Sequence, residues 1–413
     1  MRRIGLLGLL LSCGAAAGVP LLDGGHLKGR AQLAQYPDDS LFRQQLGEYD
    51  AGAAGVARLR FTGARGGFSF NADYQLIAQY AEPLALPVSG GSFYDSARAP
   101  DDQRRWWDLT DVIERDEDFL LEQRLDRLNL TWTSDKAVVR FGRQAVSWGN
   151  GLIYTPMDFL NPFDPAAVDT EYKAGDDMLY AQYLLDSGDD LQFVNVQRRD
   201  AQGDVSQAVS STALKFHGFA ATREYDLLLA QHYDEAVIGA GGLLDVGEAV
   251  VRGDLVLSDS DEGWKASLVL DWTWSWAWRG RNFSAVAEYF FNGFGLRESD
   301  YDLAALETDD ELARRLARGE LFTIGRHYAA GSLLLEWTPL LNLTGNLFYN
   351  LGDGSALAQG VAQWDLAQNW QLLGALNLPL GPEGTEYGGL ETAYEGLTLG
   401  TGPSLFLQLA WYF

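Results

Sequence analysis

Long apolar runs are absent from this sequence: after the first twenty residues, no stretch of roughly 18 residues is apolar throughout. We therefore do not expect a helical membrane protein. Cysteine occurs once, at Cys13, so no pair of cysteines can form a disulfide. Histidine occurs four times, and neither a G-x-S-x-G nor an H-E-x-x-H motif is found. We expect no catalytic residue, no metal site and no cofactor.

The N-terminal segment predicts a secretory signal peptide. Two arginines precede an apolar run over residues 4–12, and three consecutive alanines then supply a small-residue cleavage site. We expect residues 1–17 to be removed, Cys13 among them, and residues 18–413 to form one transmembrane domain. A lipoprotein-type acylation of Cys13, which would anchor the chain by its N-terminus, is the alternative interpretation.

Basic residues are few: the chain has 31 Lys and Arg against 57 Asp and Glu, a formal net charge of −26. A protein this acidic is not expected to bind nucleic acid through its overall field. Proline is scarce at 12, whereas glycine is abundant at 46, as expected for many strands joined by tight turns. The 13 Trp and 18 Tyr suit the aromatic girdles of a membrane protein.

The stretch 264–278 alternates between two kinds of side chain. One set is apolar and ends in tryptophans at 272, 274, 276 and 278; the other includes Lys265, Ser267, Asp271, Thr273 and Ser275. A period of two predicts a strand with the two sets on opposite faces. Since one set is too apolar for water and the other too polar for a soluble core, the pattern indicates a transmembrane β-barrel strand with an aromatic girdle. A soluble β-sandwich is the alternative that one strand leaves open.

Similar strands follow along the whole chain. They are predicted at 27–36, 56–62, 68–80, 121–132, 137–147, 179–185, 191–198, 213–220, 225–233, 236–244, 249–257, 264–278, 283–291, 328–337, 341–350, 356–366, 370–379 and 405–413. Short and long connections alternate between many of them, and 302–318 has helical character. We predict an all-β fold, a single antiparallel transmembrane β-barrel of about 18 strands (16–18), with short periplasmic turns and long extracellular loops.

The last strand carries the clearest signature. Leucines at 405, 407 and 409, then Trp411 and Phe413, occupy alternate positions, and the sequence stops on Phe413. This strand resembles the C-terminal strand of Gram-negative outer-membrane barrels, which ends in an aromatic residue. The resemblance implies a location in the Gram-negative outer membrane, contact with its lipid and lipopolysaccharide, and recognition of Phe413 by the barrel-insertion machinery.

The segment from Trp148 to Asp176 is the most distinctive one. The Gly-Arg-Gln strand that leads into it, followed by a glycine-rich turn, resembles porin-like barrels, including the alginate-export type. The resemblance implies porin-like function. The residues around Asn161, Phe163 and Asp164 contain two prolines and cannot continue a central strand. Because this stretch is too apolar for a solvated loop, we expect residues 150–170 to fold into or over the lumen as a constriction. Packing on the barrel rim is the alternative.

Several arginines are predicted to face the lumen by alternation. These are Arg58, Arg60, Arg124, Arg127 and Arg140, with Gln144 beside them and inward acids at Asp73, Asp271, Glu288, Glu336 and Asp365. The arginines could form an anion-attracting wall, or each could pair with an acid and brace the barrel. Arg143 points outward by alternation, so it either lies near the rim or is turned inward by a bulge at Gly142.

We expect a porin-like channel for diffusion or selective passage of small polar solutes, among them anions. A non-conducting barrel that serves assembly or export of surface material is the alternative. A surface hydrolase built on His232 is a remote third reading, with a girdle histidine favoured there. The oligomeric state is left open.

Overall fold

The computed structural model describes residues 22–80, 102–297, 301, 306 and 309–413. The predicted signal peptide and Cys13 lie outside the described residues. The strands are β1 Leu22–Gln35, β2 Tyr49–Arg65, β3 Phe68–Tyr80, β4 Thr110–Arg115, β5 Phe119–Thr133, β6 Ala137–Gln144, β7 Asp176–Leu184, β8 Asp190–Val196, β9 Ser211–Ala220, β10 Arg223–His232, β11 Glu235–Val246, β12 Ala249–Ser260, β13 Gly263–Trp278, β14 Arg281–Phe291, β15 His327–Thr338, β16 Leu341–Asn350, β17 Ala356–Ala367, β18 Trp370–Leu380 and β19 Ser404–Tyr412. The helices are α2 Leu41–Leu46, α4 Asp310–Ala317 and the short η2 Asp102–Arg104 and η3 Gln207–Val209. None of the described helices is both long and apolar enough to cross a membrane.

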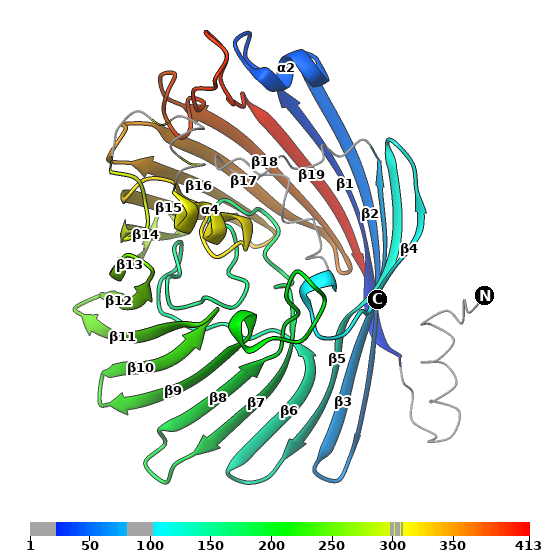
Figure 1. Cartoon of the computed structure of the whole chain (residues 1–413), viewed down its shortest axis with the longest axis vertical. Coiled ribbons are helices and arrows are strands. Elements are labelled where there is room, and N and C mark those ends of the chain that lie inside the picture. Colours follow the sequence, from blue (N-terminus) through cyan, green and yellow to red (C-terminus); the bar gives the residue numbers. More distant parts are fainter. Residues whose placement is uncertain (1–21, 81–101, 298–300, 302–305, 307–308) are drawn as a thin grey trace.

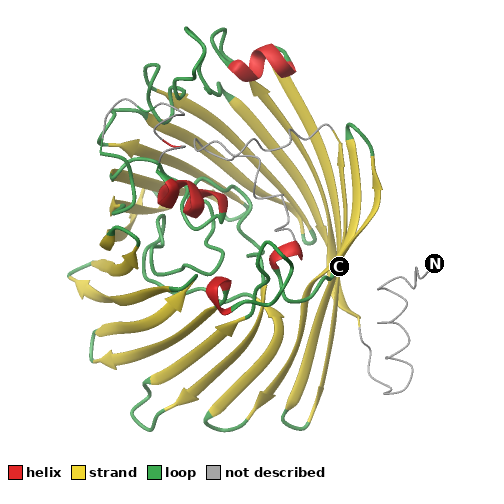
Figure 2. Ribbon diagram, in the orientation of Figure 1, coloured by secondary structure: helices red, strands yellow, loops and turns green. Residues whose placement is uncertain are grey.

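The strands form one closed antiparallel sheet (Figures 1 and 2). Each strand except β3 pairs with the next strand in the chain, and β1 pairs with β19 from His26↔Tyr412 to Ala34↔Ser404, which closes the barrel. The short β4 lies beside the upper part of β5 only, while β3 pairs directly with β5 along its length. Eighteen strands therefore close the barrel, as predicted. Closure leaves no unpaired strand edge in the hydrocarbon region.

Alternation decides which side chains face outward. On β13, Trp264, Leu270 and the tryptophans at 272, 274, 276 and 278 are 38–57% exposed, whereas Val269 and Asp271 on the other face are buried at 0% and 2%. The other strands carry exposed leucines and aromatics on the same outward face. This apolar exterior is the surface that acyl chains solvate, so the prediction of a transmembrane barrel with an aromatic exterior is confirmed.

The two ends of the barrel differ. At one end of the barrel β1 begins and β19 ends, and the strands there are joined by short turns such as 66–67 and 279–280. The connections at the other end are longer, such as 36–48, 145–175 and 381–403. Part of the connection after β3 lies outside the described residues. The predicted helical character near 302–318 is realised as α4. That the end with the longer connections faces the outside of the cell stays a prediction.

Residues 102–109, which precede β4, contact the ends of the short strands β6 to β8. Arg143, next to last in β6, is fully buried there; it contacts Asp102 and Asp177 at 2.9 Å each and donates to the Trp107 carbonyl at 2.6 Å. The β5–β6 and β6–β7 registers run through Gly142 without a shift. The proposed bulge at Gly142 is therefore wrong, and Arg143 is tolerated because it lies near the rim beneath a covering segment.

Candidate functional site

Residues 145–175, between β6 and β7, lie inside the ring of strands (Figure 1). We call this segment the internal loop. It is hydrogen-bonded to inward-facing side chains around the circumference: Asp226 on β10, Asp254 on β12, Glu288 on β14, Gln359 on β17, Gln408 on β19 and Lys28 on β1. Since β10 and β1 lie half a barrel apart in the strand order, the internal loop crosses the lumen.

The internal loop has its own apolar core. Trp148, Met157 and Leu160 are buried against inward-facing apolar side chains, which are Met178, Val194, Val196, Ala213, Leu228, Val237 and Val256 on β7 to β12. Tyr154 stacks on Phe290 of β14 with ring centroids 4.6 Å apart. Each such side chain contributes about 1.5–3 kcal/mol when it leaves water. This packing explains why the segment is too apolar for a solvated loop.

Two inward-facing carboxylates hold the turn at the start of the internal loop. Asp254 accepts the Asn150 N–H at 2.6 Å and the Asn150 side-chain amide at 2.7 Å. Glu288 accepts the N–H groups of residues 152, 153 and 154 at 3.0, 3.0 and 2.6 Å. Gly149 has a φ of +99° in this turn, which suits glycine because it has no Cβ. These bonds fix the height of the loop in the lumen.

The returning limb of the internal loop is held by ion pairs near the β1–β19 seam. Lys28 contacts Asp169 at 2.6 Å and Glu171 at 2.7 Å, and the Arg58 guanidinium lies 3.6 Å from the Tyr172 ring centroid. Lys28 and Arg58 are also buried. Both ends of the loop are therefore attached to the wall, so it cannot swing out of the lumen as one piece without breaking buried contacts.

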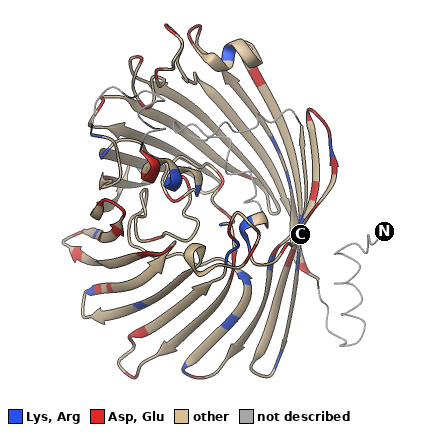
Figure 3. Ribbon diagram, in the orientation of Figure 1, with Lys and Arg blue, Asp and Glu red and all other residues tan. Residues whose placement is uncertain are grey.

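Figure 3 shows that basic and acidic residues both occur on the strands of the wall. Arg58, which contacts Tyr172 of this limb, is the centre of a buried charge cluster. It is 1% exposed and contacts Asp73 at 2.8 Å and Asp126 at 2.5 Å. Arg127 contacts the same Asp126 at 2.9 Å. The β3–β5 register shifts so that Asp126 is the extra residue of a bulge, which brings its side chain to the inner face with Arg124 and Arg127. Arg58 and Arg127 thus pair with acidic residues and brace the barrel wall, which is the second of the two arrangements predicted for the arginines.

Two of the predicted lumen arginines have a different environment. Arg60 and Arg140 are half-buried, and neither forms an ion pair with a residue that the structure describes. Arg140 donates from Nε to the Thr131 hydroxyl at 3.1 Å and lies 5.9 Å from the Tyr180 ring centroid. Arg58 and Arg127 each contact a carboxylate at ion-pair distance, whereas Arg60 and Arg140 contact none among the described residues.

The remaining predicted site residues are spread over the same region. Gln144 is buried at 1% and donates to the carbonyl of Met178 at 3.3 Å, so it belongs to the wall. Asn161 has a φ of +54° and bonds to Asp176, while Phe163 is half-buried in the internal loop. Asp164 accepts the Ala166 N–H at 2.8 Å. That these residues set the narrowest part of a pore stays a prediction.

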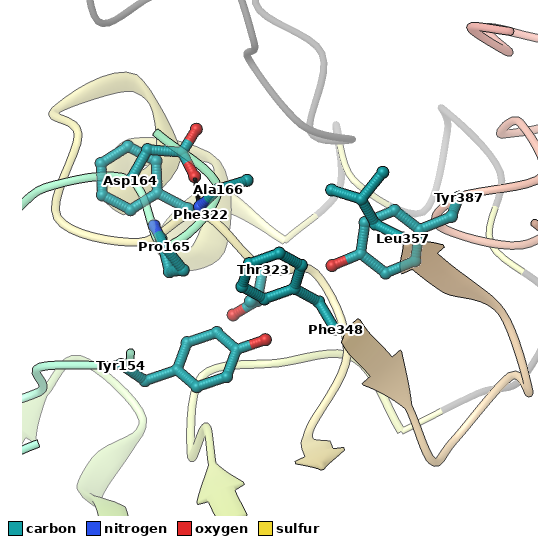
Figure 4. A pocket seen from close by; sticks show the side chains of 9 residues that line it. All are labelled: Tyr154, Asp164, Pro165, Ala166, Phe322, Thr323, Phe348, Leu357 and Tyr387. Atoms are coloured by element: carbon teal, nitrogen blue, oxygen red, sulfur yellow. Dashed lines mark hydrogen bonds between the residues drawn. The ribbon is translucent and has the colours of Figure 1, made fainter. Parts of the chain in front are cut away.

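A small pocket lies between the internal loop and the elements that face it (Figure 4). Tyr154, Asp164, Pro165 and Ala166 line it from the loop, and Phe322, Thr323, Phe348, Leu357 and Tyr387 line it from the facing elements. The Tyr154 hydroxyl is buried and has no hydrogen-bond partner in the described part of the chain. The pocket thus has room beside an unsatisfied donor, as a bound water would require.

The inner face near the short turns is different in character. There the inward-facing side chains are polar and exposed, and the outward-facing side chains next to them are exposed as well. The exposed inward-facing residues include Ser275, Asn282, Glu336 and Gln363. Asn282 donates to Glu336 at 2.6 Å across the inner face. Exposure on both faces of the same strands means that solvent reaches the lumen from this end.

His232 lies inside the barrel, so its interpretation as a girdle histidine is wrong. Its Nδ1 is 2.7 Å from the Ser211 hydroxyl, and its Nε2 is 3.1 Å from Glu320. These residue types also form hydrolytic triads. However, Ser211 and His232 are each 2% exposed, and Arg198 already donates to the Ser211 hydroxyl at 2.6 Å. A substrate therefore has no room to approach Ser211. The hydrogen bonds from Ser211 through His232 to Glu320 instead link β9 and β10 to the 292–326 connection.

Glu386 joins two connections above the lumen. This buried carboxylate accepts hydrogen bonds from the Tyr328 hydroxyl at 2.7 Å, the Asn350 side chain at 2.8 Å and the Ile324 N–H at 3.1 Å. Burial raises the pKa of Glu386 to about 7, and the nearby Asp353 carboxylate raises it further against these bonds. The connections 292–326 and 381–403 are therefore coupled by one titratable group.

The contacts that sequence reasoning missed depend on the fold. Asp126 reaches the inner face only through a bulge, and Asp254 bonds to a loop residue 104 positions away. The alternation of β12 could have placed Asp254 inward, but no local signal names its partner.

No known family model matches the sequence, and no curated protein matches it. Solved structures do match its fold. Acinetobacter baumannii OccAB4 aligns with a TM-score of 0.52 at 9% identity, over 94% of this chain and 97% of that chain. Pseudomonas aeruginosa OpdQ gives 0.51 at 7%, over 94% and 97%, and a BenF-like porin from Pseudomonas fluorescens Pf-5 gives 0.50 at 9%, over 95% and 98%. The likeness concerns the fold: this chain forms the same kind of closed β-barrel as these porins of Gram-negative bacteria.

Proposed function

We propose that the protein is a constricted channel through which small polar solutes diffuse across the outer membrane. The observation that carries the proposal is the internal loop, which crosses the lumen and is attached to β10, β12, β14, β17, β19 and β1. A loop fixed inside a closed barrel narrows the path without needing a separate plug domain.

The solvent-exposed lumen near the short turns supports a conducting channel in preference to a barrel whose lumen is closed. Inward-facing Ser275, Asn282 and Gln363 are exposed there. A path for hydrated solutes requires such a polar, solvated inner face. The narrowest part is then the rim of the internal loop, to which Asn161, Phe163 and Asp164 belong.

Anion preference is the finer part of the proposal, and it rests on Arg60 and Arg140. Both face the lumen, both are half-buried, and neither has a carboxylate partner among the described residues. Arg58 and Arg127 are excluded from this role because Asp73 and Asp126 neutralise them. Selectivity would thus come from two arginines, while the others brace the wall.

Reconstitution in planar bilayers tests the proposal. Discrete conductance steps are expected, and liposome swelling with charged and neutral solutes of one size should rank anions first. Absence of any step from a correctly folded barrel would favour the alternative, a non-conducting barrel in assembly or export. Steps without anion preference would retain the channel and remove the role of Arg60 and Arg140.

A further inference from the structure

Two arginines at the turn between β13 and β14 lie on tryptophan rings. The guanidinium carbon of Arg279 is 4.7 Å from the ring centroid of Trp278, and that of Arg281 is 3.4 Å from that of Trp337. Neither arginine has a hydrogen-bond or ion-pair partner among the residues that the structure describes. By alternation, Arg281 shares the outward face of β14 with Phe283. The turn therefore presents two uncompensated positive charges on the outside of the barrel.

The rings next to these charges form a continuous aromatic surface. Trp276 stacks on Phe283 with centroids 5.3 Å apart and an interplanar angle of 9°, and Trp274 lies 6.2 Å from Trp276 at 17°. Trp278 is 57% exposed and Trp337 is 45% exposed. Such rings at the end of a transmembrane strand lie at the level of the lipid headgroups.

The guanidinium N–H groups of Arg279 and Arg281 can still donate hydrogen bonds. A ring beneath a guanidinium contacts its face and leaves its N–H groups free at the edge, where a phosphate can be bound by two parallel hydrogen bonds. An outward arginine is tolerated at the interface far better than at the bilayer centre. Arg279 also has a φ of +52°, in a two-residue hairpin position that asparagine or glycine ordinarily fills. An arginine thus occupies a turn position whose positive φ favours glycine or asparagine.

We propose that Arg279 and Arg281, supported by Trp278 and Trp337, bind the phosphate of an anionic phospholipid headgroup. The lipid belongs to the leaflet at the short-turn end, and its acyl chains lie along Trp274, Trp276 and Phe283. Two positive charges without an ion-pair partner among the described residues, in a chain with a net charge of −26, match a negatively charged headgroup. The inference concerns the outer surface and does not depend on conduction through the lumen.

Native mass spectrometry of the detergent-purified barrel tests this site, with phosphatidylglycerol as the probe and phosphatidylcholine as the neutral comparison. The double variant Arg279→Asn/Arg281→Gln removes both charges, and asparagine suits the turn. We expect it to bind phosphatidylglycerol roughly tenfold more weakly, the loss expected for charge-assisted hydrogen bonds. Trp337→Leu keeps both charges and should weaken binding by removing the support of Arg281.

Arg223→Gln is the matched control. Arg223 is exposed on the outward face of β10 at the same end, without a tryptophan ring beneath it, and its loss should leave binding unchanged. Three results would overturn the proposal: equal binding of both lipids by the unmodified barrel, undiminished binding by both site variants, or preference for lipid A over phosphatidylglycerol. Bilayer conductance should be the same in all variants, so failure here is distinguishable from failure of the channel proposal.

Discussion

The carboxylate of Glu288 accepts the backbone N–H of Tyr154 at 2.6 Å, across 134 residues of sequence. Two further N–H groups of the internal loop bond to the same carboxylate. A strand side chain thus takes the place that water would have at a solvated turn. The position of the loop in the lumen is decided by the wall around it.

Replacing Glu288 should therefore loosen the internal loop. Glu288→Ala leaves three partly buried N–H groups without an acceptor, each costing about 1–3 kcal/mol. We expect larger and noisier conductance steps in planar bilayers. Glu336→Ala is the control, because Glu336 is an exposed inward carboxylate near the short turns, bonded to Asn282. Identical traces from both variants would contradict the role of the internal loop as the constriction.

Arg140 should contribute to ion selectivity. Arg140→Ala is expected to lower the anion-to-cation permeability ratio by roughly twofold to fivefold, since one charge a few ångströms from an ion in water contributes about 1 kcal/mol. Reversal potentials across a salt gradient measure this ratio. Arg140→Lys retains the charge and should restore it. A ratio unchanged by the alanine variant would refute the anion-attracting role.

Arg58 should matter for stability more than for selectivity. Arg58→Ala leaves Asp73 and Asp126 buried without their main cation, which costs about 3–5 kcal/mol. We expect a lower unfolding temperature in detergent. Arg60→Ala, on the same face of β2, breaks no ion pair and should unfold near the temperature of the unmodified barrel. Equal destabilisation by both substitutions would count against the bracing assignment.

The coupling through Glu386 should depend on pH. Its pKa is raised from 4.5 to about 7 in the folded chain, so its contribution to stability is fully present below pH 4.5 and is lost as the pH rises through 7. Amide hydrogen exchange around 381–403, corrected for its intrinsic pH dependence, should become faster between pH 6 and 8, across the raised pKa. Glu386→Gln cannot ionise and should show no such transition, whereas a flat profile in the unmodified chain would contradict the prediction.

The barrel and its orientation of side chains were predictable from the sequence. A period of two along strands such as 264–278 assigns the faces, since alternate side chains point to opposite sides, and the spacing of turns gave about 18 strands. The apolar character of 152–160 also indicated that this stretch needed a buried surface. These are local properties, and each can be read from a few consecutive residues.

The partners of the inward-facing charges were not predictable. Alternation places Arg58 and Arg140 on the same face, yet only Arg58 meets two carboxylates, because a one-residue bulge in β5 turns Asp126 inward. Likewise, alternation placed Arg143 outward, but the segment that buries it comes from before β4. By itself, the sequence determined which face each side chain takes. The closed tertiary structure decided which charges are neutralised and where the internal loop is held, because barrel closure and loop insertion bring together residues that are far apart in the chain.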